Sequence, residues 1–212
     1  MKSLDPEIVN AVNNSQLQVY RAAMQLFAER GVSQVTVKDL AQAAGVARGT
    51  IYNNFSSIED LFEDVAGNLA HDMNDRVIRS CGETTDPAIR LATGMRLYVR
   101  RAHEEPDWGR FVIRFGLGVT TMRHMWDGQP MEDLRTGINR GRYSIRKDQL
   151  PSAVSLVAGA VISACFLVQE GIKGWREAGS NAAEITLTGF GVPRHEARAI
   201  AFGELPPLVP SA

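Results

Sequence analysis

The stretch from Thr36 to Phe62, TVKDLAQAAGVARGTIYNNFSSIEDLF, decides the fold of this chain. Thr36 followed by Asp39 predicts a capping box, in which a threonine and an acid three residues later satisfy the free amides of a first helical turn. The apolar face of this short helix is formed by Leu40, Ala41 and Ala44. Gly45 follows at the place where helices commonly end in a left-handed residue. The stretch therefore begins with a short helix and a glycine turn.

A second short helix is predicted from Arg48 to Asn54. Ile51 and Phe55 lie four residues apart, so they share one edge of this helix and anchor it. The polar side chains that point elsewhere are Arg48, Thr50, Tyr52, Asn53 and Asn54. Two short helices, a tight glycine turn and a hydrogen-bonding edge predict a helix-turn-helix, whose second helix enters the major groove of DNA.

Three segments of this region resemble the helix-turn-helix of the TetR-type bacterial transcriptional regulators. They are LFAERG at 26–31, TVKDLA at 36–41 and AGVARGTIYNNF at 44–55. Two positions depart from the family pattern. Ala47 stands where the family usually has a serine or another capping residue, which removes a cap worth about 1 kcal/mol. Ile58 stands where the family has a phosphate-contacting lysine.

The resemblance implies a role for each polar residue of the reading head. Thr36 and Tyr52 match positions that hold phosphates. The positions that reach bases or neighbouring phosphates are Lys38, Arg48, Thr50 and Asn53, with Asn54 as a weaker candidate and Gly49 allowing close backbone approach. Arg48 could pair with guanine O6 and N7, and Asn53 with adenine N6 and N7. The alternative is that these are solvated residues on a short helix.

Composition describes a globular chain without a basic signature. The 212 residues are 44% hydrophobic, and the formal net charge is −1. DNA binding would therefore depend on a few placed groups and on dimer symmetry, rather than on a general positive field. The two cysteines form no CxxC pair, and no apolar signal peptide opens the chain, so we expect a cytoplasmic protein.

The pattern predicts an all-α fold with two domains. Residues 1–56 are expected to form the DNA-binding domain, with 1–13 as a polar arm and a first helix capped by Asn14 or Ser15. Residues 57–212 are expected to form a helical-bundle domain for ligand binding and dimerisation, with 204–212 as a loose tail. Later helices are predicted at 57–80, 87–103, 130–141, 150–173, 181–190 and 194–202. One more helix is predicted after 87–103, with Asp107 as its capping residue.

The run from Leu150 to Val168 has no charge over a length that could span a bilayer. It contains a proline, three serines and a glycine, and it is a single run. We therefore predict a buried helix and no membrane contact.

This run also supplies the predicted homodimer face. Small residues at four-residue spacing would let another helix approach closely, and the neighbouring valines add apolar area. The candidates are Val154, Ser155, Val157, Gly159, Val161, Ser163 and Phe166, with Leu187 and Phe190 on the next helix. The family resemblance implies a four-helix interface between subunits. The alternative is that the stripe packs inside one subunit.

The middle of the chain carries a predicted pocket for a small-molecule effector. Flexible thioethers and flat rings suit an apolar ligand site. The candidates are Met95, Tyr98, Phe111, Phe115, Met122, Met125 and Trp126, and the charged residues that could orient an anionic ligand are Arg114, Arg123 and His124. The alternative is ordinary core, with a DNA-binding dimer that answers to a protein partner or has no ligand. The resemblance implies a repressor that ligand releases from a pseudo-palindromic operator.

An α-helical enzyme is the hypothesis from another class. The four histidines show no HxxxH or HExxH spacing, and no GxSxG or phosphate-binding loop occurs. Cys81 and Cys165 have no local histidine partner, and a buried inert thiol is expected for Cys165. No catalytic residue, metal ligand or cofactor is predicted.

Overall fold

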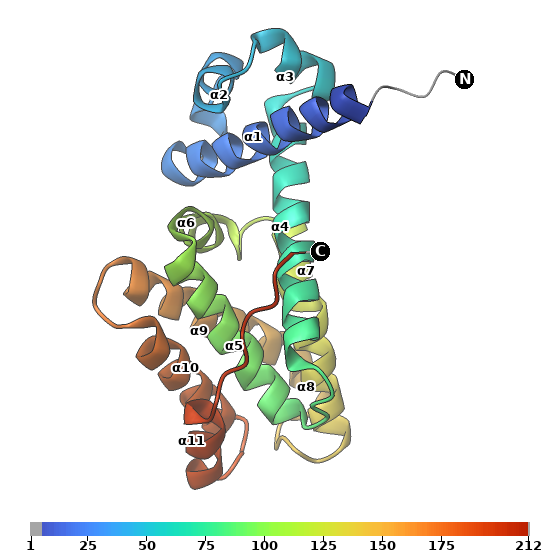
Figure 1. Cartoon of the computed structure of the whole chain (residues 1–212). Helices are drawn as coiled ribbons and strands as arrows, with labels where there is room; N and C mark the ends of the chain where they lie inside the picture. The colour runs from blue at the N-terminus through green and yellow to red at the C-terminus, as the bar shows by residue number, and fades with distance from the viewer. Residues whose placement is uncertain (1–5, 212) are drawn as a thin grey trace. The chain divides into compact units, whose positions relative to one another are not determined.

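A computed structural model of the chain describes residues 6–211, with side chains described from residue 15 onward. Within these residues every regular element is helical and none is a strand, as the all-α prediction requires (Figure 1). The chain divides into two compact units, Met1–Ala66 and Gly67–Ala212. The division falls inside helix α4 (Ile58–Cys81). The sequence-based boundary of 56/57 lies in the loop before this helix. The reason is that the first turns of α4 bury Leu61, Phe62 and Val65 in the N-terminal unit.

The N-terminal unit contains α1 (Pro6–Arg30), a short 3-10 helix η1 (Val32–Gln34), α2 (Val37–Ala44), α3 (Arg48–Asn54) and the start of α4. Phe27 and Phe62 meet edge to face, with ring centroids 5.4 Å apart, and this pair joins α1 to α4. The first helix begins at Pro6 and not at Asn14 or Ser15. Proline suits the first position of a helix, and the residues that follow contain no helix breaker, so the expected arm is helical from Pro6 onward. The rest of that predicted arm, residues 1–5, lies outside the described residues.

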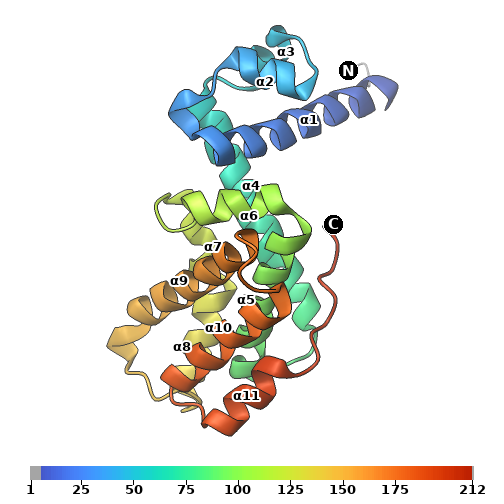
Figure 2. The same ribbon diagram turned by 90° about the vertical axis from the view of Figure 1, so that its left-hand side faces the viewer.

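The C-terminal unit is a helical bundle around α5 (Pro87–Glu104). This helix packs against α6 (Pro106–Phe115), α8 (Gln129–Asn139), α9 (Leu150–Gln169) and α10 (Trp175–Gly189), as two views show (Figures 1 and 2). The remaining elements are η2 (Thr121–Arg123), α7 (His124–Asp127), η3 (Lys147–Gln149) and α11 (Arg194–Phe202). The largest fully buried side chains of this unit include Leu97, Trp108, Phe111, Met122, Met125, Leu134 and Leu187.

Several helix ends differ from the sequence-based prediction. Asp107 lies in the first turn of α6 and does not cap it, because the N-cap residue is Glu105. The apolar helix α9 ends at Gln169 and not near Lys173, since Gly171 takes a left-handed conformation with φ of 67°. Helix α10 already begins at Trp175, well before the predicted start at 181. The last helix has the predicted bounds of 194–202.

The C-terminal tail is extended, but residues 204–211 are not loose. Arg76 Nε and Arg79 NH2, both on α4, donate to the carbonyls of Val209 and Pro210 at 2.8 and 2.7 Å. The Val209 amide donates to Ser80 Oγ at 2.9 Å, and Leu208 is buried. The prediction of a loose tail is therefore wrong, because partners about 130 positions earlier in the sequence hold it against α4. Residue 212 lies outside the described residues.

Candidate functional site

Helix α2 begins with the capping box that the sequence predicts. The Thr36 hydroxyl accepts a hydrogen bond from the Asp39 amide at 3.2 Å and donates one to Asp39 Oδ2 at 2.6 Å. The Thr36 amide also donates to Asp39 Oδ2, at 3.1 Å. The hydrogen bond from the Thr36 hydroxyl, followed by the one from its amide, lowers the pKa of the Asp39 carboxyl below its usual value. Arg30 lies 3.7 Å from the same carboxylate. The start of α2 is thus fixed by groups of its own unit.

The turn between α2 and α3 has the geometry that Gly45 predicts. Gly45 adopts φ of 67° and ψ of 30°, and the Val46 amide donates to the Ala41 carbonyl at 3.0 Å. These contacts close the C-terminus of α2 as in a Schellman motif. Ala47 is the N-cap residue of α3 and makes no side-chain capping bond. The first turn of α3 therefore lacks the cap that the family pattern supplies.

Helix α3 has one buried edge and one exposed edge. Ile51 and Phe55 are buried, and the Phe55 ring meets Tyr20 of α1 edge to face at 5.9 Å. Tyr52 is 66% exposed, so its ring and its hydroxyl are open to a partner. The other exposed residues of the predicted set are Thr36, Lys38, Arg48, Gly49, Asn53 and Asn54, while Thr50 is half-buried. The arrangement presents a guanidinium, a phenol and an amide along one short helix.

Two predicted DNA contacts have local partners in the structure. The Thr36 hydroxyl is used on both its donor and its acceptor side within the cap. The Asn54 amide Nδ2 donates to the Thr50 carbonyl at 2.7 Å and so closes the end of α3. These bonds favour a positioning role for Thr36 and Asn54. Arg48, Tyr52 and Asn53 are the side chains of α3 best placed to reach DNA.

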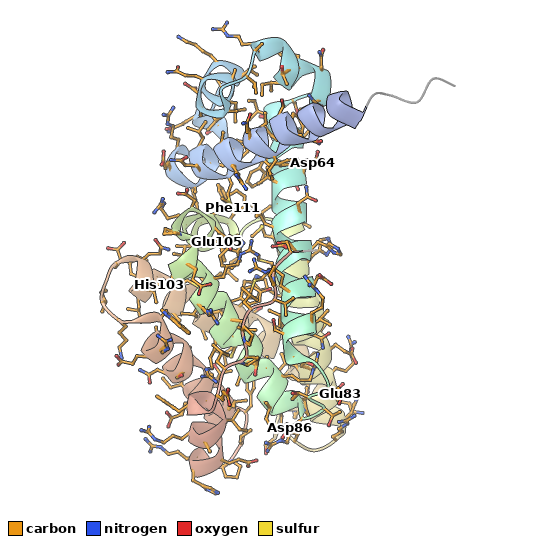
Figure 3. All side chains as sticks on the ribbon, viewed as in Figure 1. Asp64, Glu83, Asp86, His103, Glu105 and Phe111 are labelled. Atoms are coloured by element: carbon orange, nitrogen blue, oxygen red, sulfur yellow. The ribbon has the colours of Figure 1, made fainter. Side chains whose placement is uncertain are left out.

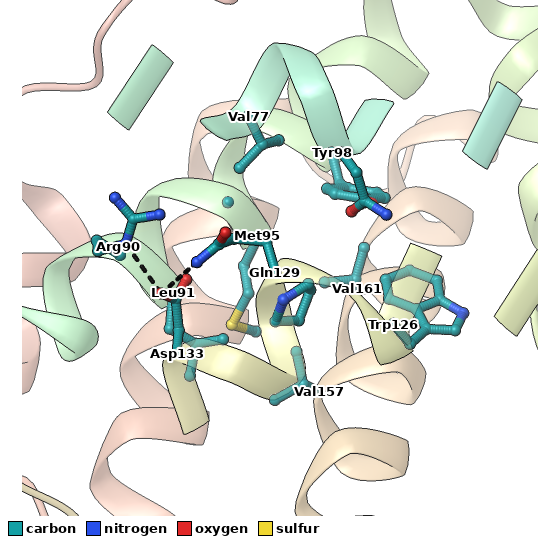
Figure 4. Close-up of a pocket in the computed structure, with 13 residues that line it drawn as sticks. Val77, Arg90, Leu91, Met95, Tyr98, Trp126, Gln129, Asp133, Val157 and Val161 are labelled. Atoms are coloured by element: carbon teal, nitrogen blue, oxygen red, sulfur yellow. Dashed lines mark hydrogen bonds and ion pairs between the residues drawn. The ribbon is translucent and has the colours of Figure 1, made fainter. Parts of the chain in front are cut away.

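A small internal cavity of about 20 Å³ lies in the C-terminal unit, between α4, α5, α8 and α9 (Figure 4). One end is polar, because Arg90 Nε donates to Asp133 Oδ1 at 2.9 Å and Gln129 Nε2 donates to the same oxygen at 2.8 Å. Burial raises the pKa of the Asp133 carboxyl, although the hydrogen bonds from Arg90 and Gln129 oppose the change. The other walls are mostly apolar. A space of this size holds about one water molecule.

Three of the seven predicted pocket residues line this cavity: Met95, Tyr98 and Trp126. The Tyr98 hydroxyl lies 3.3 Å from Asn74 Oδ1, and its ring is 5.2 Å from that of Trp126. The other four predicted residues do not line it: Phe111, Met122 and Met125 are fully buried core, and Phe115 is half-buried on α6. Sequence reasoning missed the polar wall of Asn74, Arg90, Gln129 and Asp133. The sequence shows that Gln129 and Asp133 are four residues apart and so share one helix face. It does not show that this face is turned toward a cavity.

A second, open pocket of about 340 Å³ adjoins this cavity. Trp126 lines both spaces, and its indole Nε1 donates to the Gly116 carbonyl at 2.7 Å. The sequence offered three charged residues that could orient an anionic ligand. Of these, Arg123 lines the open pocket, and Arg114 and His124 line neither space. Trp126 is therefore a lining residue that the two spaces share.

The predicted dimer residues fall into two groups. Five of them are buried within the chain and cannot contact a partner directly: Val154, Val157, Val161, Leu187 and Phe190. The helices of the same chain cover these five side chains, and Val157 and Val161 line the internal cavity. Ser155, Ser163 and Phe166 are exposed, and Gly159 is half-buried. Exposed apolar neighbours that the sequence did not single out are Leu156 on α9 and Ile185 on α10.

Among the described residues, one helical segment, Lys147–Gln169, is long and apolar enough to cross a membrane, with a mean hydropathy of 2.1. Buried helices in water-soluble proteins share this composition. Only 39% of its most apolar window is buried inside the chain. Leu156 and Phe166 are about half exposed, so this helix has apolar surface that the chain itself does not cover.

The side-chain chemistry of the described residues offers no metal cluster, since no three histidine, cysteine, aspartate or glutamate residues converge within 15–211. Both cysteines are buried. Burial raises the pKa of the Cys81 thiol, and it raises the pKa of Cys165 to about 12. Neither thiol is in a setting that favours a nucleophile.

Both units match known protein families. Residues 19–65 match the family described as bacterial regulatory proteins, tetR family. Residues 86–202 match the tetracyclin repressor-like C-terminal domain. The first match contains the whole helix-turn-helix, and the second contains most of the bundle and every lining residue of the internal cavity except Asn74 and Val77.

Curated relatives match over part of their own length. The repressor KstR2 of Mycobacterium tuberculosis is 29% identical over 84 residues, which cover 40% of this chain and 42% of that protein. The regulator TtgR of Pseudomonas putida is 35% identical over 90 residues, 42% of each chain. These alignments thus span less than half of either relative. The crystal structure of RolR in complex with resorcinol covers 95% of this chain and 100% of that one, at 27% identity and a TM-score of 0.70.

Proposed function

This chain belongs to the TetR family of helix-turn-helix transcriptional regulators, and on that premise we propose that it is a dimeric repressor controlled by a small molecule. Proteins of this family bind DNA and are not enzymes, which answers the enzyme hypothesis. The repressor would act on a pseudo-palindromic operator and, as a DNA-binding regulator, in the cytoplasm.

The exposed edge of α3 is the observation that carries this proposal. Arg48, Tyr52 and Asn53 project from a helix whose other edge is fixed by Ile51 and Phe55. Arg48 would pair with a guanine and Asn53 with an adenine in the major groove, while Tyr52 would donate to a phosphate. The capping box and the Gly45 turn hold α2 behind this helix. Because the net charge is −1, these placed groups carry the affinity in place of a basic surface.

Dimerisation would use the exposed faces of α9 and α10. Ser155, Leu156, Gly159, Ser163 and Phe166 follow one another at intervals of one to four residues along an uncovered face of α9. Small residues permit close helix contact, and the leucine and phenylalanine supply apolar area. Across a two-fold axis the same patch would meet its own copy. This arrangement would also cover the apolar surface that makes α9 resemble a membrane segment.

The effector site would be the internal cavity after expansion. At about 20 Å³ the cavity is far smaller than an ordinary ligand site, so a ligand must displace its walls. Trp126 is the wall next to the open pocket. RolR, which resembles this chain over nearly its whole length, was crystallised with resorcinol. A flat ring with hydroxyl groups suits a cavity whose walls are apolar and whose far end carries Arg90, Gln129 and Asp133.

Helix α4 provides a physical link between effector and DNA. Asn74 and Val77 of α4 line the cavity, and the first turns of the same helix belong to the DNA-binding unit. A ligand that displaced α4 would favour states in which the two reading heads no longer match the operator spacing. Operator DNA would then weaken ligand binding by the same factor, because the coupling is reciprocal.

DNA binding is tested by fluorescence anisotropy with an operator selected by the purified protein. Arg48→Ala is expected to cost about 1–3 kcal/mol and to relax base preference at one position. Arg194→Ala removes an exposed arginine from α11 and serves as the matched control, with unchanged affinity expected. Equal effects of the two variants would contradict the assignment of Arg48.

The effector site is tested by thermal unfolding with phenol and resorcinol. A ligand that binds only the folded state raises the unfolding temperature and weakens operator binding. Gly94→Ala adds a methyl group at the cavity wall, 3.4 Å from Val77 Cγ1, and should reduce both effects. Gly118→Ala, which meets no atom within 4 Å, is the control. If no hydroxylated aromatic shifts either readout, the near-closed cavity favours a dimer that answers to a protein partner or to no ligand.

A further inference from the structure

A third pocket, of about 480 Å³, lies on the surface of the C-terminal unit where α5, α10 and the end of α11 meet. Figure 2 shows these three helices side by side. We call it the arginine pocket and define it by Arg96, Arg100, Trp175, Arg176, Phe202 and Leu205. It shares no lining residue with the internal cavity or with the open pocket next to Trp126. Its volume is in the range of small-molecule sites.

The charges of the arginine pocket are not balanced. Arg100 pairs with Glu104 at 2.7 Å, and the only acid in the lining, Glu177, pairs with Lys173 at 2.5 Å. Arg96 and Arg176 have no carboxylate partner among the described residues. Two cations therefore face one pocket in a chain whose net charge is −1.

Arg96 is the more constrained of these two cations. It is half-buried, and its NH2 group donates to the Gly203 carbonyl at 2.8 Å. Burial lowers the pKa of its guanidinium, which means that its surroundings disfavour the charge. A cation withdrawn from water without a counter-charge is costly, and an anion in the pocket would offset that cost.

The rest of the pocket adds aromatic surface. The Arg176 guanidinium lies 4.4 Å from the centre of the Trp175 ring. The ring of His103, a residue of α5 labelled in Figure 3, stacks on the Trp175 ring with 6.5 Å between the ring centres. Phe202 is 47% exposed, and the Arg198 guanidinium lies 4.9 Å from the centre of its ring, so the apolar surface open to a ligand is the part of the ring that Arg198 does not cover.

We propose that the arginine pocket binds a small anion that carries a flat apolar group, such as an aromatic carboxylate. The carboxylate lies between Arg96 and Arg176, and the ring lies against Phe202 and Leu205. Planar guanidinium groups are suited to bind a carboxylate through two parallel hydrogen bonds. This site is separate from the proposed effector cavity and does not depend on the proposed function.

Isothermal titration calorimetry of the full chain with naphthoate and with its neutral analogue naphthamide tests this site. Naphthoate is expected to bind saturably, and naphthamide at least about tenfold more weakly, because the charge-assisted hydrogen bonds are lost. Arg176→Gln removes an exposed side chain from the pocket without touching the core, and should weaken naphthoate about tenfold. Circular dichroism confirms that the variant remains folded.

Arg194→Gln is the matched control, because Arg194 is equally exposed, lies on the neighbouring α11 and does not line the pocket. It should leave naphthoate binding unchanged. Equal binding of naphthoate and naphthamide, an equal loss in both arginine variants, or no saturable naphthoate binding would each overturn the proposal. Because Arg176 does not line the internal cavity, its effect separates this site from the effector site.

Discussion

Replacing Thr36 by valine separates two roles that this residue could have at the DNA-binding surface. The family pattern implies a phosphate contact, whereas the structure shows the hydroxyl fully used in the cap of α2, with bonds of 3.2 and 2.6 Å. Valine keeps the size and the branched shape of the side chain and removes only the hydroxyl. Loss of a threonine N-cap costs about 1 kcal/mol of local helix stability.

That cost has a measurable local consequence. Because 1.4 kcal/mol corresponds to a factor of ten, opening of α2 should become about fivefold more frequent. Native-state hydrogen exchange of the amides in 37–44 should therefore accelerate about fivefold, with Leu40 as a clear reporter because its amide donates to the Thr36 carbonyl at 3.0 Å. Thr36→Ser retains a hydroxyl and should exchange as the parent protein does.

Operator affinity then distinguishes the two roles. If Thr36 acts as a cap, affinity falls by no more than the same factor of about five, and only together with faster exchange. A residue that mainly holds a phosphate would lose affinity while the exchange of α2 stayed unchanged. That second pattern would refute the capping argument.

Three further predictions concern the dimer face, the packing of the bundle and the response to acid. Phe166→Asp should convert a dimer into a monomer in light scattering at micromolar concentration, because a charge would enter an apolar interface; an unchanged dimer would contradict the proposed face. In Gly137→Ala the new methyl group would overlap the buried Tyr143 ring, so the free energy of unfolding in urea should fall by about 3 kcal/mol, and an unchanged midpoint would contradict this packing. The lowered pKa of Asp39 means that the ionised carboxylate stabilises α2 above its unfolded pKa, and that this stability is lost as pH falls through the folded value. Carboxyl titration by nuclear magnetic resonance should show the pKa of Asp39 rising toward its usual value in Thr36→Val, and no rise would count against the hydrogen bond.

The reading head could be predicted from sequence because its signals are local. Thr36 and Asp39 lie three residues apart, and Gly45 directly follows the helix that it ends, so both signals act within one turn. The start of α1 was missed because residues 6–14 show little apolar periodicity, although Asp5 followed by Pro6 has the order of a capping residue and a first helical position. The end of α9 was placed a few residues too late, because the uncharged run gave no stop signal before Gly171.

Features that depend on distant residues could not be predicted in the same way. Arg90 and Asp133 meet across 43 positions, and Ser211 donates to Asp72 across 139. Helix α9 is apolar on almost every side, so its periodicity could not decide which valines face the core and which residues face outward. The valines that the sequence offered for a dimer face are buried within the chain, and the proposed interface therefore uses the exposed residues of the same helix.

Selection of bound DNA from a random pool, with the purified full chain and at low salt, tests the central claim most directly. A dimeric sequence reader predicts a pseudo-palindrome whose half-sites are about 34–36 Å apart or a multiple of that distance. Enrichment of such a sequence, lost in Arg48→Ala, is the expected result. Recovery of no enriched sequence, or of a single unpaired half-site, would contradict the account.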